Sequence, residues 1–117
     1  MLVFVYGTLK RDKHNHYMMG KSSYLRDIEL PVKGILYWND KRNFPHFVED
    51  ESGDFITGEL YEVDEQTALG LDIFEGHPKY FRRKSCQFES QQVFYYEYVG
   101  YQTFNEDLNK FHKIKSY

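Results

Sequence analysis

The stretch LDIFEGHPKYFRR, residues 71–83, marks the point where a short helix must give way to a strand. Gly76 suits the left-handed residue that follows a helix, and Pro78 prevents the helix from continuing. Upstream, Asp64 is a favourable N-cap for a helix over residues 65–75. The sequence therefore predicts one helix that ends in a tight turn and leads directly into a strand.

Segments rich in β-branched and aromatic residues lie on both sides of this helix, and turn-forming residues separate them. The run Leu2–Tyr6 is apolar throughout, as expected for a strand buried on both faces. Other extended segments are predicted at 23–29, 32–38, 44–50, 55–63, 80–88 and 93–101. The polar residues 105–117 are expected to form a short terminal helix.

These elements predict an α+β fold in a single domain spanning residues 1–117. The expected architecture is a small mixed, mostly antiparallel β-barrel with one main helix. Aromatic residues make up 19% of the chain, and large rings pack well on strands. Many tyrosine hydroxyls must also find polar partners, which favours a cavity with a partly polar lining.

The charge and cysteine content limit the possible partners. The net charge of −3 opposes binding to a phosphate backbone, which needs a positive surface. Cys86 is the single cysteine, so no intramolecular disulfide can form and a reducing compartment is favoured. The N-terminal apolar run is too short for a signal peptide or a membrane span. We expect a cytoplasmic protein, monomeric or weakly homo-oligomeric, that binds neither nucleic acid nor membranes.

Glu75 stands where electrostatics disfavour a carboxylate. A helix C-terminus carries roughly half a negative charge, which destabilises an anionic side chain by a few tenths to about 1 kcal/mol. Asp72, three residues earlier, is expected to share its face and repel it. Burial among Phe74, Tyr80 and Phe81 would raise the pKa of Glu75 further. Glu75 is therefore a candidate proton acceptor, and the alternative is a solvated glutamate without contacts.

The stretch VYGTLK, residues 5–10, is the second candidate site segment. A buried strand ends at Tyr6, and Gly7 allows a sharp turn or the close approach of a ligand. The backbone N–H groups of Thr8 and Leu9 could then bind a carboxylate, and Thr8 adds a hydroxyl. The alternative is an ordinary glycine between a strand and a loop.

Together these stretches resemble the γ-glutamylcyclotransferase-like family, and within it the γ-glutamylamine cyclotransferase-like branch. Members typically carry V-Y-G-T/S-L near the N-terminus and L-D-x-x-E-G…Y-x-R some seventy residues later. Residues 5–9 and 71–76 match these motifs here, followed by Tyr80 and Arg82. The stretches VKGILYW, NFPHFVED and ITGELYEVD resemble intermediate family motifs in the same order. The resemblance covers about residues 2–100.

The resemblance implies an enzyme that uses neither metal nor cofactor. It would convert a γ-glutamyl amide, whether of an amine, an amino acid or a lysine isopeptide, into 5-oxoproline and a free amine. Glu75 would act as the general acid/base. The residues implied in substrate binding are Tyr6, Gly7, Thr8, Leu9 and Tyr80.

One position departs from the family pattern, since relatives often have an aromatic residue where this chain has His77. His77 could alter the pocket wall or add a second titrating group near Glu75. His14 and His16 are too few to predict a metal site. The alternative function is a non-catalytic module that binds a small acid on the same fold. A carboxylate in the pocket would not help such a module to bind an anion.

Overall fold

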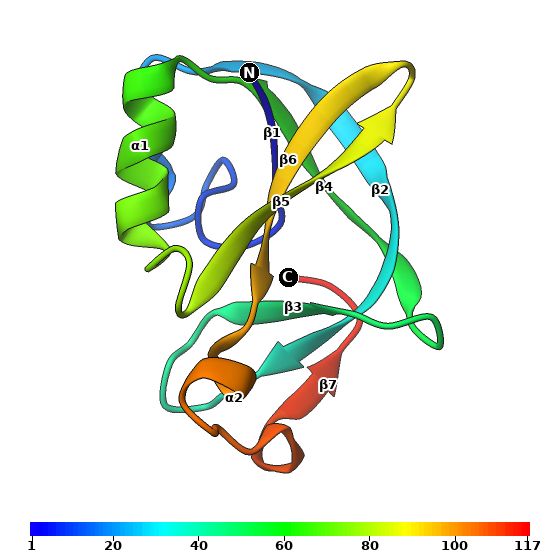
Figure 1. Ribbon diagram of the computed structural model, residues 1–117. Helices are drawn as coiled ribbons and strands as arrows, with labels where there is room; N and C mark the ends of the chain where they lie inside the picture. Colours follow the sequence, from blue (N-terminus) through cyan, green and yellow to red (C-terminus); the bar gives the residue numbers. More distant parts are fainter.

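The computed structural model describes all of residues 1–117. Its sheet follows the order β3-β2-β4-β1-β6-β5, and β7 also pairs with β2. The strands are β1 (Leu2–Val5), β2 (Ser23–Trp38), β3 (Pro45–Glu49), β4 (Asp54–Glu62), β5 (Phe81–Phe88), β6 (Gln91–Tyr98) and β7 (His112–Ile114). All pairings are antiparallel except that of β1 with β6. The predicted α+β class and the mixed, mostly antiparallel sheet are confirmed. The sheet curls into a half-barrel (Figure 1).

One helix dominates the helical part of the chain. The helical segments are α1 (Glu65–Phe74), α2 (Gly100–Thr103) and the 3₁₀ turns η1 (His16–Met19) and η2 (Leu108–Lys110). The Asp64 side chain accepts a hydrogen bond from the backbone N–H of Thr67 at 2.7 Å, and Gly76 has a φ of 66°. The predicted N-cap and left-handed glycine are therefore confirmed. None of these helices has the length and apolar character needed to cross a membrane.

Three predictions about the elements were wrong, of which the smallest is the strand expected at 93–101: it ends at Tyr98, and α2 begins at Gly100. The strands expected at 23–29 and 32–38 are one continuous strand, β2, whose register with β4 shifts between Glu29 and Lys33. Pro31 lies at this irregularity, where a residue without a backbone N–H can be tolerated. The expected terminal helix over 105–117 is instead η2 followed by β7. The strand forms because β2 offers a free edge there, and Leu36–Trp38 pair with it.

Strand β1 separates two hydrophobic clusters, because its side chains alternate between the two faces of the sheet. Val3 and Val5 pack on the side of α1, in a cluster that includes Leu71. Phe4 and Tyr6 pack inside the curl of the sheet, in the second cluster. The strand is thus buried on both faces, as predicted. Figure 1 shows the blue segment after β1 running beside α1. The residues that follow β1 therefore lie at the junction of helix and sheet.

Polar side chains join the two edges of the curled sheet. The Glu49 backbone N–H, from β3, donates to Glu97 of β6 at 2.8 Å, and the Tyr95 hydroxyl donates to Glu49 at 3.1 Å. Lys84 of β5 forms ion pairs with both Glu49 and Glu97. Because β3 and β5 share no strand pairing, this cluster holds the half-barrel in its curled shape.

Candidate active site

The buried face of α1 continues into Glu75. Ala68 and Leu71 are the buried residues of this helix, and Glu75 follows Leu71 by four positions. Residues with this spacing lie on one face of a helix, so Glu75 is directed toward the sheet. Glu75 is the C-cap residue, and its backbone N–H still donates to Leu71 O at 2.9 Å. The packing of α1 therefore orients the glutamate inward.

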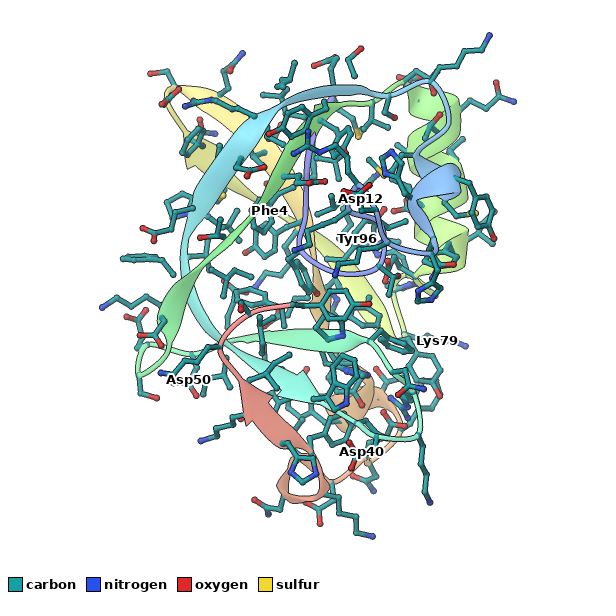
Figure 2. The ribbon with its side chains drawn as sticks, turned by 180° about the vertical axis from the view of Figure 1, so that it is seen from behind. Phe4, Asp12, Asp40, Asp50, Lys79 and Tyr96 are labelled. Carbon is teal, nitrogen blue, oxygen red and sulfur yellow. The ribbon has the colours of Figure 1, made fainter.

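Glu75 meets the segment after β1 in a small pocket, which we call the inner pocket. Its volume is about 40 Å³, enough for one or two water molecules. Its lining residues are Phe4, Val5, Tyr6, Gly7, Thr8, Leu9, Phe44, Pro45, Glu75, Phe81 and Tyr96. Figure 2 shows Tyr96 deep in the molecule beside the blue loop. The two sequence segments singled out above thus lie together, although some seventy residues separate them.

Burial changes the acidity of Glu75. The loss of water contacts raises the pKa of its carboxyl group from 4.5 to about 7. The expected repulsion by Asp72 is not part of the cause. Asp72 instead accepts a hydrogen bond from the Tyr96 hydroxyl at 2.6 Å and lies 3.4 Å from the Arg83 guanidinium. Half of the Glu75 carboxyl groups would therefore be ionised near neutral pH.

The loop after β1 presents unpaired backbone donors. Gly7 O accepts a hydrogen bond from Lys10 N–H at 3.1 Å, which closes a turn with Thr8 and Leu9 at its centre. The backbone N–H groups of Gly7, Thr8 and Leu9 donate to no other protein group. Free N–H groups on one turn are a typical binding site for a carboxylate or an oxyanion.

Neighbouring side chains hold this loop in place. Asn15 donates its side-chain amide to the Thr8 hydroxyl at 2.9 Å. The Tyr6 hydroxyl donates to Tyr96 O at 2.7 Å, so this hydroxyl is already used within the protein. Gly7 lies against Pro45, where a Cβ atom would come within 3.2 Å of the proline ring. Gly7 therefore serves close packing, and its φ is not positive.

A buried glutamate on β4 fixes the far end of the same loop. Glu59 is 8% exposed, and it accepts hydrogen bonds from the Arg11 backbone N–H at 2.8 Å and from Arg11 Nε at 3.1 Å. The Tyr61 hydroxyl also donates to it at 3.0 Å. The sequence analysis did not single out Glu59, because it lies within a strand pattern and no local motif indicates its pairing with the distant Arg11.

A wider depression, which we call the outer chamber, adjoins the inner pocket. Its volume is about 530 Å³. The residues lining it are Asn15, Arg42, Phe44, Ile73, Phe74, Glu75, Gly76, Tyr80 and Phe81. Phe44, Glu75 and Phe81 line both spaces, so the two adjoin at these three side chains. Tyr80, predicted in the binding site, lies only in the outer chamber and is 41% exposed.

The remaining sequence candidates lie apart from both spaces. His77 lines neither space, and its Nδ1 accepts a hydrogen bond from the Arg83 backbone N–H at 3.0 Å. Arg82 is exposed on β5.

Phe44 and Pro45 were missed as pocket residues, although they belong to a stretch that resembles a family motif. Aromatic residues before a strand are compatible with core packing alone, so only the tertiary structure places them at the pocket.

Comparison with known proteins identifies the family of this chain. A family model described as gamma-glutamyl cyclotransferase, AIG2-like, matches residues 3–115. A Methanocaldococcus jannaschii protein, provisionally named as a gamma-glutamylcyclotransferase, is 42% identical over 83 residues, which cover 70% of this chain and 67% of that protein. The gamma-glutamylaminecyclotransferase of Rattus norvegicus is 34% identical over 97 residues, which cover 73% of this chain and 61% of the rat protein.

A solved structure from the same family has a similar fold. The crystal structure of an AIG2-like protein from Mus musculus matches with a TM-score of 0.83 and 29% identity, over 99% of this chain and 86% of the mouse chain. In sequence, the matches span about two thirds of the archaeal relative and less of the rat one. The family model nevertheless covers nearly the whole chain. The chain belongs to the gamma-glutamyl cyclotransferase, AIG2-like family of enzymes.

Proposed function

We propose that this protein closes the glutamyl part of a γ-glutamyl amide into 5-oxoproline and releases the amine. The observation that carries this proposal is the inner pocket itself. A desolvated carboxyl group, Glu75, and a turn with unpaired N–H groups, at residues 7–9, line the same small space. Relatives named as γ-glutamyl and γ-glutamylamine cyclotransferases support the same reaction class.

In this proposal the loop holds the glutamyl head. The α-carboxylate or the γ-carbonyl oxygen would accept hydrogen bonds from the N–H groups of Gly7, Thr8 and Leu9. The inner pocket is smaller than a glutamyl group, so the head would also occupy the adjoining part of the outer chamber. Holding the chain curled brings the α-nitrogen near its own γ-carbonyl carbon. Such intramolecular positioning can supply effective molarities of about 10⁵ M or more.

Glu75 would move the proton. Its carboxylate accepts one proton from the substrate α-ammonium, and the freed amine attacks the γ-carbonyl carbon to form the ring C–N bond. The bond to the leaving nitrogen then breaks as Glu75 returns its proton to that nitrogen. The ring nitrogen next gives its second proton, through the same carboxylate, to the released amine, which leaves as an ammonium ion. Of the three protons on the α-ammonium, one therefore stays on the lactam nitrogen and two depart with the amine. General acid–base help of this kind typically contributes about 10²- to 10⁴-fold.

The first test is direct product detection. The protein is incubated with γ-glutamyl amides, and 5-oxoproline and free amine are quantified by chromatography. We expect the two products in equal amounts. Glutamate in place of 5-oxoproline would indicate hydrolysis by water and contradict cyclisation. Retained 5-oxoproline binding without turnover of any substrate would favour the non-catalytic binding module.

We predict a pH dependence set by Glu75. Only its carboxylate can accept the substrate proton, so kcat/KM should rise with pH and level off above the pKa of about 7. Below that pH the rate should fall about tenfold per pH unit. Initial rates of 5-oxoproline release between pH 5 and 8.5 would check this. A profile that is flat down to pH 5 would mean that an ordinary, hydrated carboxylate or another group acts.

We also predict that Glu59 positions the loop. Glu59→Gln removes the charge that accepts both Arg11 donors. Hydrogen bonds to a charged group contribute about 1.5–3 kcal/mol, so the loop should lose order and KM should rise by roughly tenfold. The change in kcat should be smaller, because Glu75 is untouched. Glu29→Gln, an exposed change on β2, is the control. Steady-state kinetics of both variants would decide, and an unchanged KM in Glu59→Gln would contradict the prediction.

A further inference from the structure

The outer chamber is the space left for the leaving amine. The glutamyl head is assigned to the loop side of Glu75, and Glu75 must also reach the departing nitrogen. The outer chamber adjoins the inner pocket, and Phe44, Glu75 and Phe81 line both. The group attached to the leaving nitrogen would therefore extend into this chamber. Its lining should decide which amines are accepted.

The single basic side chain of the chamber is already paired. Both Nη atoms of Arg42 donate to the Glu106 carboxylate, and Nη1 also lies 3.3 Å from His46 Nε2. The guanidinium carbon lies 5.6 Å from the ring centroid of Tyr80. Glu75 is the one carboxyl group in the lining, and the proposed reaction uses it. The chamber therefore offers neither an unpaired carboxylate nor a free cation, and a second ammonium group on the substrate would find no charged partner there.

Apart from Asn15, whose side-chain amide donates to the Thr8 hydroxyl, the other side chains of the chamber are apolar or aromatic and partly uncovered. Ile73 is 83% exposed, Tyr80 is 41% exposed and Phe74 is also exposed, while Phe44 forms the wall toward the inner pocket. Exposed apolar groups beside a pocket gain free energy when an apolar ligand covers them. An alkyl or aromatic group on the leaving nitrogen would extend from Glu75 over these side chains. It would cover them without removing water from an unpaired charge.

We propose that the preferred substrates are γ-glutamyl amides of apolar monoamines, above all arylalkyl amines, and that Ile73 and its neighbours bind the apolar group. The inference rests on the proposed cyclotransferase function and narrows it. Diamines and lysine isopeptides carry a further charged group that this chamber does not match. They should therefore be poorer substrates than an amide with a simple aromatic tail.

Three amides with the same glutamyl head test this inference. They are the γ-glutamyl amides of phenethylamine, of cadaverine and of methylamine, which are amines of similar basicity. We expect kcat/KM for the phenethylamide to exceed that for the methylamide by at least about tenfold, because an aromatic group becomes buried. The cadaverine amide should be no better than the methylamide. A cadaverine amide that is used best, or three equal values, would overturn the inference but leave cyclisation intact. No 5-oxoproline from any of the three would overturn the proposed function itself.

A pair of helix variants locates the binding surface. Ile73→Ser removes an apolar side chain of the chamber and should lower the phenethylamide-to-methylamide ratio of kcat/KM about three- to fivefold. Leu69→Ser is the matched control, because Leu69 lies one turn earlier on α1, is 64% exposed and is not part of the chamber. Its ratio should equal that of the wild-type protein. Equal ratios in all three proteins would show that the aromatic group binds elsewhere and would contradict the assignment to Ile73.

Discussion

Glu75→Gln is expected to abolish turnover while preserving the fold. The amide keeps the size and shape of the side chain, but at neutral pH it can neither accept nor return a proton. The rate of 5-oxoproline release should fall by at least about 10²- to 10⁴-fold, the range typical of a lost general acid–base group. Circular dichroism and binding of 5-oxoproline should remain close to those of the wild-type protein.

The same substitution should raise stability above neutral pH. Because the unfolded chain ionises near pH 4.5 and the folded protein near 7, the wild-type folded state binds the extra proton between these values. Its free energy of unfolding therefore falls as pH rises from 4.5 to 7, by roughly 3 kcal/mol at about 1.4 kcal/mol per pH unit. Glutamine does not ionise, so the variant does not lose this stability as the pH rises. Urea unfolding should give the variant a higher free energy of unfolding than the wild-type protein at pH 8, but not at pH 5.

Glu65→Gln is the matched control for both effects. Glu65 is an exposed glutamate in the first turn of α1, far from the inner pocket along the helix. Its substitution should leave turnover unchanged and should not reproduce the pH-dependent gain in stability. Turnover by Glu75→Gln at the wild-type rate would remove Glu75 from the mechanism.

Gly58→Ala is expected to be strongly destabilising and to weaken catalysis. A Cβ atom on Gly58 would lie 2.4 Å from Val5 O and 2.6 Å from the ring of Phe4. Both belong to the end of β1, so that strand must move, and the loop at residues 6–9 must move with it. Overpacking of this kind costs about 1–3 kcal/mol and occasionally more. Since the loop carries the proposed anion-binding N–H groups, kcat/KM should also fall by at least about tenfold.

Gly70→Ala gives the opposite outcome from the same chemical change. Gly70 lies inside α1, and an added Cβ would come within 4 Å of no atom beyond its chain neighbours and the backbone of its own helix. Alanine should stabilise the protein by about 0.5–1 kcal/mol, because glycine is a poor helix former. Urea unfolding and kcat/KM of the two variants provide the comparison. Wild-type stability and activity in Gly58→Ala would mean that β1 and β4 are not so closely packed.

The local features of the fold could be predicted from the sequence. The N-cap at Asp64 and the left-handed Gly76 are local preferences, and they place the end of α1 within one residue. The inward direction of Glu75 was also within reach, because the spacing from Ala68 and Leu71 continues to Glu75. The sequence could not predict that 23–29 and 32–38 form one strand, because their continuity depends on pairing with the distant β4.

The surroundings of the site depend on tertiary contacts. We expected Asp72 to repel Glu75 on the assumption that the Asp72 carboxylate has no partner. In the structure Asp72 pairs with Tyr96 and Arg83, which lie on the sheet. The pairing of Arg42 with Glu106 joins residues 64 positions apart and removes the only free cation from the outer chamber. Such pairs have no sequence signal, and they determine which charges remain available to a substrate.

Titration of the Glu75 carboxyl group tests the central claim most directly. The protein is produced with glutamate labelled with ¹³C at the side-chain carboxyl carbon, and its NMR signal is assigned by its loss in Glu75→Gln. We predict a midpoint near pH 7 for this one glutamate, matching the midpoint of kcat/KM. A midpoint near 4.5 would show that the group faces water, and the proposed proton transfer at neutral pH would lose its physical basis.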